Sequence, residues 1–275
     1  MHTSAKKHFL VTIYWRMFYS SKKWKTFISE RVDPARIDLS SFEVKEELSP
    51  DVWQDDDFIK KDVKKNLKKI AEDFLDSLDV KNSLIDDIII TGSGANYNWS
   101  KFSDVDLHIL LDFSKIDENT DLVKKMFDKA KFEWNKIHDI NIGDHEVEIY
   151  AQDSNEPHVS SGIYSVLDDK WVKKPNKLQV TLEKDDIKTK AAKLMEEIDE
   201  IEQNSERDPG NTYDSVISLK KKLGKMRKCG LEKGGEFSVE NLAFKVLRRN
   251  GYLEKLNNLK LKAYDDLLSL EESEK

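Results

Sequence analysis

The stretch from Ile88 to Phe113, IIITGSGANYNWSKFSDVDLHILLDF, decides the fold. It opens with a β-branched run, Ile88–Thr91, which is typical of a buried strand. Gly92-Ser93-Gly94 then interrupts the strand, and backbone N–H groups exposed at such a turn suit the binding of a phosphate. After a polar loop, residues 103–111 alternate polar and apolar side chains, which predicts a second strand.

Two carboxylates on this second strand point to metal chemistry. Alternation places Asp104 and Asp106 on one face of the strand, about 7 Å apart. Both are ionised at neutral pH and repel each other unless a hard cation lies between them. Mg²⁺ is the usual cation, because it takes oxygen ligands from one or two carboxylates and from substrate phosphates. His108 shares this face, and we interpret it as a hydrogen-bonded neighbour rather than a ligand.

The order of strand, Gly92-Ser93, spacer and Asp104-x-Asp106 resembles the polymerase-beta-type nucleotidyltransferase superfamily. The resemblance implies that Asp104 and Asp106 are catalytic residues that hold Mg²⁺ or Mn²⁺. It also implies that Gly92 and Ser93 bind the phosphates of a nucleoside triphosphate. An ordinary turn followed by solvated aspartates is the alternative, and the combination of both motifs on two strands disfavours it.

The same superfamily places a third acidic residue on a later strand. Residues 145–150, HEVEIY, alternate in the manner of a strand and put Glu146 and Glu148 on one face. Glu148, between two apolar neighbours, fits the third catalytic and metal-binding position best, and Glu146 is the other candidate. Aspartate is more common at that position in the family, so glutamate departs from the pattern.

A second resemblance extends over most of residues 24–260. The chain is similar to uncharacterised nucleotidyltransferase-like proteins of large tailed phages. The residues that carry this resemblance are LSPDVW at 48–53, NYNWS at 96–100, SDVDLH at 103–108 and GGEFS at 234–238. Many superfamily members have a further glycine near the position of Tyr97, which this chain lacks.

Apolar periodicity outlines the remaining elements. A short helix is expected over 24–32, and helices are expected around 63–74 and over 119–138, with a hairpin of 161–166 and 171–173. Trp53 is expected to anchor into the core. Four helical stripes follow residue 176; Pro209-Gly210 separates the first two, and Gly230 with Gly234-Gly235 is expected to end the second. Ser238 is expected to cap the third.

These elements predict an α+β fold with a small mixed sheet and a C-terminal helical bundle. The expected divisions are an N-terminal extension and irregular segment at 1–57, a nucleotidyltransferase core at 58–176 and a helical domain at 177–275. In the helical part, residues 219–233 carry seven basic residues against one acidic residue. Lys221 and Lys225 lie on one stripe of this helix, and we expect them to bind phosphate; a solvated helix face is the alternative.

Composition limits the function classes. The net charge of −7 argues against a protein that coats DNA, so any contact with nucleic acid must come from a local basic patch. The single cysteine, Cys229, excludes an intrachain disulfide and fits a reducing cytoplasm. No apolar run is long enough to cross a bilayer, so we expect a cytoplasmic protein with no membrane partner.

The sequence therefore predicts a magnesium-dependent enzyme that transfers a nucleoside monophosphate from a nucleoside triphosphate, such as ATP, to a hydroxyl acceptor and releases pyrophosphate. RNA, tRNA or a nucleotide is the favoured acceptor. A protein-modifying nucleotidyltransferase of the AMPylation type and a catalytically silent relative that binds nucleotide or RNA are the alternatives.

Overall fold

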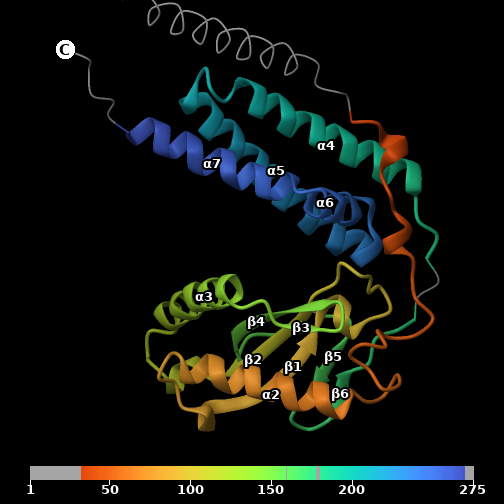
Figure 1. The fold of residues 1–275 in the computed structure, drawn as a ribbon, viewed down its shortest axis with the longest axis vertical. Coiled ribbons are helices and arrows are strands. Elements are labelled where there is room, and N and C mark those ends of the chain that lie inside the picture. The colour runs from red at the N-terminus through yellow and green to blue at the C-terminus, as the bar shows by residue number, and fades with distance from the viewer. Residues whose placement is uncertain (1–31, 159, 178–179, 270–275) are drawn as a thin grey trace, which may run out of the picture. The chain divides into compact units, whose positions relative to one another are not determined.

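The computed structural model describes residues 32–158, 160–177 and 180–269. The chain divides into two compact units (Figure 1). Residues 38–182 form the sheet unit, and the described parts of 1–37 and 183–275 form the helical unit. Mixed sheet and helices confirm the α+β class. The helix expected over 24–32 lies outside the described residues, except for Val32.

A six-stranded sheet organises the first unit. Its order is β3-β4-β2-β1-β5-β6, with β2 and β4 parallel and the other neighbours antiparallel. The strands are β1 (Ile85–Thr91), β2 (Val105–Leu111), β3 (Asn141–Ile142), β4 (His145–Asp153), β5 (Ile163–Ser165) and β6 (Lys170–Lys173). The expected strands and the hairpin are confirmed, although β2 begins after Asp104, so that Ser103 and Asp104 lie in the preceding loop.

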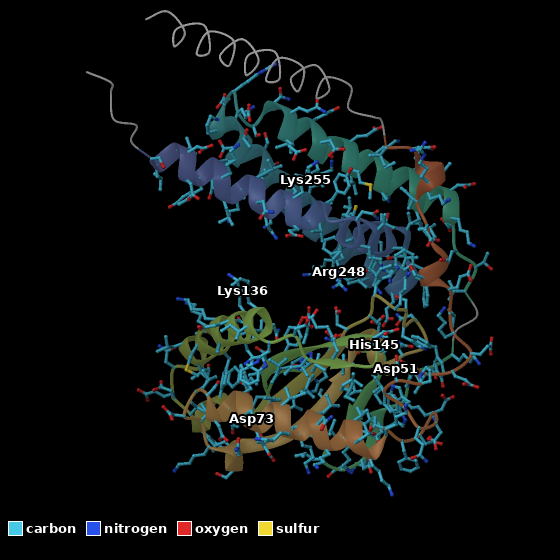
Figure 2. The ribbon with its side chains drawn as sticks, viewed as in Figure 1. Asp51, Asp73, Lys136, His145, Arg248 and Lys255 are labelled. Atoms are coloured by element: carbon cyan, nitrogen blue, oxygen red, sulfur yellow. The ribbon has the colours of Figure 1, made fainter. Side chains whose placement is uncertain are left out.

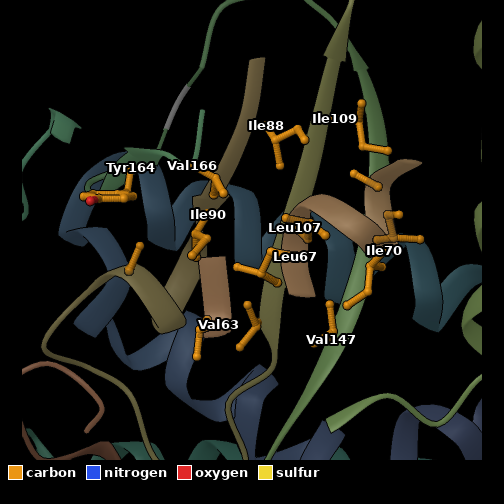
Figure 3. Packing of buried hydrophobic residues seen from close by; sticks show 14 of the residues in the cluster. Val63, Leu67, Ile70, Ile88, Ile90, Leu107, Ile109, Val147, Tyr164 and Val166 are labelled. Atoms are coloured by element: carbon orange, nitrogen blue, oxygen red, sulfur yellow. The ribbon is translucent and has the colours of Figure 1, made fainter. Parts of the chain in front are cut away.

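Two helices, α2 (Lys61–Asp76) and α3 (Thr120–Ile137), pack on one face of the sheet, as their apolar spacing predicts. Leu67 of α2 lies against the strand residues Ile90 and Leu107 in the main core cluster (Figure 3). Full burial of a leucine side chain stabilises the fold by roughly 1.5–3 kcal/mol. Because successive strand residues point to opposite faces, this apolar face fixes the direction of the polar residues on the other face.

The segment 38–57, irregular as expected, belongs to the sheet unit. It contains the 3₁₀ turn η2 (Ser40–Phe42), and its Leu48, Val52 and Trp53 join the main core. Trp53 stacks on Trp171, with ring centroids 4.7 Å apart, and its Nε1 donates a hydrogen bond of 2.8 Å to the Gly94 carbonyl. The expected anchoring of Trp53 in the core is confirmed. Its hydrogen bond to Gly94 also holds the Gly-rich turn in place.

The helical unit contains α4 (Lys184–Asn204), α5 (Pro209–Gly234), α6 (Val239–Arg249) and α7 (Tyr252–Leu268), which contact one another. The 3₁₀ turn η1 (Pro34–Arg36) packs on α4. Ser238 caps α6 by accepting a hydrogen bond from the Asn241 amide, as predicted. Within the described residues, no helix is both long and apolar enough to span a membrane.

Gly230 does not end its helix, contrary to expectation, because α5 continues to Gly234. A Cβ at Gly230 would lie 2.6 Å from the Cβ of Glu240 and 2.8 Å from the Ser238 hydroxyl. Glycine at this position therefore allows α5 to approach the start of α6. A packing requirement, rather than a break in the helix, accounts for the residue.

Candidate functional site

Asp106 occupies the centre of the polar face, the sheet face opposite α2 and α3. Its strand β2 lies between β1 and β4, where the register partners of Asp106 are Thr91 and Glu148. Val105 and Leu107, its neighbours in sequence, are fully buried on the other face. Asp106 itself is half-buried. The alternation in the sequence thus translates directly into a carboxylate held on a rigid central strand.

Gly92 lies directly against the Asp106 carboxylate. It begins the 3₁₀ turn η4 (Gly92–Ala95) with a φ of +69°, a conformation that favours glycine. A Cβ on Gly92 would lie only 1.9 Å from Oδ2 of Asp106. The backbone and the carboxylate can approach this closely only because residue 92 has no side chain, and Ser93 follows in the same turn.

Asp104 lies in the loop immediately before β2. A Cβ on Gly94 would be 3.1 Å from the Asp104 carbonyl oxygen, so the second glycine of the turn packs against the backbone of this loop. The Gly-rich turn therefore approaches the two aspartates at two points, one through the Asp106 side chain and one through the Asp104 backbone.

Glu148 projects from β4 on the polar face and accepts a hydrogen bond from the Tyr150 hydroxyl. Burial raises the pKa of Tyr150, and the carboxylates of Glu148, Asp106 and Asp104 raise it further. All three negative charges thus act on one hydroxyl. Glu146, by contrast, is exposed, and its register partner is Asn141 on the edge strand β3.

His108 and Tyr150 stack beside this carboxylate group, with ring centroids 4.8 Å apart. Nδ1 of His108 lies 3.0 Å from Oε1 of Gln152, which gives the histidine the hydrogen-bonded setting expected from the sequence. Burial lowers the pKa of His108 to about 4. The His108 imidazole is therefore neutral at physiological pH. On the Tyr150 ring, the Lys131 ammonium lies 4.5 Å from the ring centroid.

A buried histidine that the sequence did not single out supports the loop of Asp104. Nδ1 of His145 lies 2.8 Å from the Ser103 carbonyl oxygen, and Nε2 lies 2.8 Å from the Ser49 hydroxyl. Since a carbonyl only accepts, Nδ1 carries the proton in the neutral ring and Nε2 accepts from Ser49. The Asp51 carboxylate is 3.8 Å from Nε2, and Figure 2 shows the two residues close together. The dyad of Ser49 and His145 is buried, which suits a structural role.

The donor chemistry of this face fits a hard divalent ion, because it consists of carboxylates without sulfur ligands. Register pairing brings Asp106 and Glu148 to the same level of adjacent strands. Across the described ranges, however, no group of three or more His, Cys, Asp or Glu side chains that could hold a metal ion is found. The Glu148 carboxylate accepts the hydrogen bond from Tyr150.

Lys221 and Lys225 lie on α5 in the helical unit, and both are exposed. Other lysines of the basic run have partners within the same unit: Lys222 contacts Glu197 at 2.7 Å, and Lys228 lies 4.0 Å from Glu232. The helical unit also has a polar hollow of about 540 Å³ between α4 and α5, whose lining includes Glu197, Glu200 and Asp214. Neither aspartate of the polar face belongs to this hollow.

Comparison with known proteins gives no match: no family model, curated protein or solved structure resembles the chain closely enough to report.

Proposed function

We propose that the protein is a metal-dependent nucleotidyltransferase, which moves a nucleoside monophosphate from a nucleoside triphosphate to a hydroxyl acceptor and releases pyrophosphate. The observation that supports this most strongly is the approach of the Gly92 turn to Asp106, with Glu148 as the register partner of Asp106 on β4. A turn that can present amides to phosphate thus adjoins a carboxylate pair on two central strands.

In this proposal, Asp104, Asp106 and Glu148 hold Mg²⁺ or Mn²⁺. When bound, the metal would stabilise charge on the attacking and leaving oxygens of the displacement. The chain itself orients the substrate: the amides of the Gly92-Ser93 turn and the Ser93 hydroxyl would bind phosphate oxygens. Rigid placement of these groups on strand ends supplies most of the expected rate enhancement, as in phosphoryl transfer generally.

Glu148 is the better third carboxylate for two reasons. It is half-buried beside Asp106, whereas Glu146 is exposed at the edge of the sheet. It also accepts a hydrogen bond from the Tyr150 hydroxyl. The charges of Asp104 and Asp106 act on the same hydroxyl and raise its pKa. Tyr150 would then act as a positioning residue, whose hydroxyl holds the Glu148 carboxylate by a hydrogen bond.

RNA, tRNA or a nucleotide is the acceptor class that we favour, with the exposed Lys221 and Lys225 contributing phosphate contacts, and we propose a cytoplasmic setting. Incubation with each labelled nucleoside triphosphate, Mg²⁺ or Mn²⁺, and tRNA, total RNA or host protein tests the proposal. A labelled RNA or nucleotide product supports the proposal. Label found only on protein would show that the acceptor is a protein instead. Absence of transfer together with metal-independent nucleotide binding would favour the catalytically silent relative.

A further inference from the structure

The helices α5 and α7 pack side by side in the helical unit (Figure 1). The rings of Tyr213 and Tyr264 lie 5.8 Å apart, and the Lys220 ammonium donates a hydrogen bond to Oδ1 of Asn257. Because residue numbers rise along α5 while those of the contacting residues fall along α7, the two helices are antiparallel. Each has an inner stripe of residues buried in the bundle: Val216, Leu219 and Leu223 on α5, and Leu256, Leu259 and Ala263 on α7.

A second, outer stripe of apolar residues on the same two helices is accessible to solvent. On α7 it consists of Leu261, Tyr264 and Leu268, whose separations of three and four residues place them on one side of the helix. Their exposed fractions are 59%, 48% and 64%. On α5, Tyr213 and the exposed Ile217 are four residues apart, and the contact of Tyr213 with Tyr264 joins the two stripes. We call these five residues the α5–α7 face.

Two lysines adjoin one end of the α5–α7 face. Lys220 follows Ile217 by three residues on α5, and Lys260 follows Asn257, the hydrogen-bond partner of Lys220, by three residues on α7. Within the described ranges neither lysine forms an ion pair, although Glu254 and Asp265 lie on the same helix as Lys260. Burial lowers the pKa of Lys220, and the charge of Lys260 lowers it further. This end of the face is therefore positively charged.

The apolar and charged parts follow each other along the helix axes. Lys220 is seven residues from Tyr213, a rise of about 10 Å. An amphipathic helix that lies along the face would contact it through residues spaced at three and four positions. Leucine and isoleucine side chains offer no ring on which a nucleobase could stack, so the composition of the face favours a protein helix over single-stranded RNA.

We propose that the α5–α7 face binds an amphipathic helix of a partner protein through its apolar side chains, with a carboxylate one turn beyond them that pairs with Lys220 and Lys260. The charge of the face supports this choice of partner, because a contiguous apolar patch marks an interaction site and the two lysines call for an acid. A second copy of the chain that presented the same face would bring lysines to this end instead. The inference does not depend on the proposed nucleotidyl transfer, because the face lies in the helical unit.

Fluorescence anisotropy of a labelled synthetic helix, titrated with the full chain, tests this inference. The probe is an amphipathic peptide of about 18 residues with leucine at i, i+4 and i+7 and glutamate at i+11. Saturable binding is expected, and the double substitution of Leu261→Ser and Leu268→Ser should weaken it at least about tenfold. Phe132→Ser, at an exposed aromatic residue of α3, is the control and should change the affinity less than about twofold. No saturable binding, or equal affinity in the leucine variant, would overturn the proposal.

Reversal of charge tests the pairing with the carboxylate. Lys220→Glu should weaken binding of the glutamate peptide at least about tenfold and should strengthen binding of a matched peptide with lysine at i+11. Lys262→Glu, at an exposed lysine two residues after Lys260 and thus on a different side of α7, is the matched control. It should change neither affinity more than about twofold, and thermal unfolding checks that all variants are folded. An equal loss for both peptides in Lys220→Glu would reject the carboxylate pairing.

Two measurements address other occupants of the face. Sedimentation of the free protein reports self-association, and a dimer that the leucine variant dissociates would assign the face to a second copy instead. A short single-stranded RNA that displaces the peptide and also loses affinity in the leucine variant would assign it to RNA. A monomer that binds the glutamate peptide, with no displacement by RNA, supports the partner helix, and this result would stand even if the protein transferred no nucleotide.

Discussion

Oδ2 of Asp106 would lie 1.9 Å from a Cβ placed on Gly92. The contact links the two motifs of the sequence, since the Gly-Ser turn ends β1 and the aspartate lies on β2. Asp106 is also the register partner of Glu148 on β4. The contact between Gly92 and Asp106 therefore lies next to β4 as well. A side chain at position 92 would therefore displace the central carboxylate of the proposed site.

Gly92→Ala should destabilise the fold by more than the roughly 1–2 kcal/mol cost of a left-handed alanine, because it also displaces Asp106. Urea unfolding measures this cost. Gly235→Ala is a matched control: Gly235 has a φ of +67°, but no atom lies within 4 Å of its added Cβ. Equal destabilisation by the two substitutions would show that Asp106 moves aside without cost.

Glu148→Gln should reduce nucleotidyl transfer by several orders of magnitude, because it removes a charged metal ligand. Glu146→Gln, two residues away and exposed, should retain near wild-type turnover. Rates at saturating triphosphate and Mg²⁺ compare the variants. Loss of transfer in Glu146→Gln with retention in Glu148→Gln would reverse the assignment of the third carboxylate.

His108 should make the fold less stable in acid. Its pKa in the folded chain is about 4, below the ordinary 6.5 expected in the unfolded chain. As the pH falls from 6.5 to 4, the unfolded chain therefore takes up a proton that the folded chain does not. This lowers the free energy of unfolding by roughly 3 kcal/mol.

Urea unfolding at pH 7 and pH 4.5 measures this contribution of His108. The loss of stability on acidification should be smaller in His108→Gln than in the wild type, by roughly 2–3 kcal/mol. His138→Gln, at an exposed histidine of the same unit, should follow the wild type. Parallel pH dependence in the wild type and His108→Gln would show that His108 is not held neutral.

The basic stripe of α5 should contribute to RNA binding through its charge. Simultaneous replacement of Lys221, Lys225 and Lys228 by glutamine should weaken RNA binding and make its dependence on salt shallower, by roughly 0.7 in logarithmic slope for each lost phosphate contact. The same change at Lys61, Lys65 and Lys68 of α2 is the control. An unchanged slope in the α5 variant would leave these lysines as a solvated helix face.

The sequence was most informative where burial and alternation coincide. The continuous β-branched run Ile88–Thr91 and the alternation that begins at Val105 made both strands and the face of Asp106 predictable. Helices with one apolar stripe, such as α2 and α3, were equally predictable. The strand pairing of Asp106 with Glu148 was not, because register depends on contacts between segments distant in sequence.

Contacts between distant residues account for what the sequence did not show. His145 joins Ser49 and Ser103 across 96 and 42 residues, and no local pattern signals such a bridge. Gly230 was expected to end a helix because glycine is a poor helix former. The close approach of Glu240 and Ser238 to Gly230, visible only in three dimensions, explains its presence inside α5.

The most direct test of the account is divalent-dependent nucleotidyl transfer by the wild type and by Asp106→Ala, with labelled nucleoside triphosphates, Mg²⁺ or Mn²⁺, and RNA acceptors. Thermal unfolding first verifies that the variant is folded. The account predicts labelled product and pyrophosphate from the wild type, and a loss of several orders of magnitude in rate for Asp106→Ala. A folded Asp106→Ala variant that retains near wild-type turnover would contradict it.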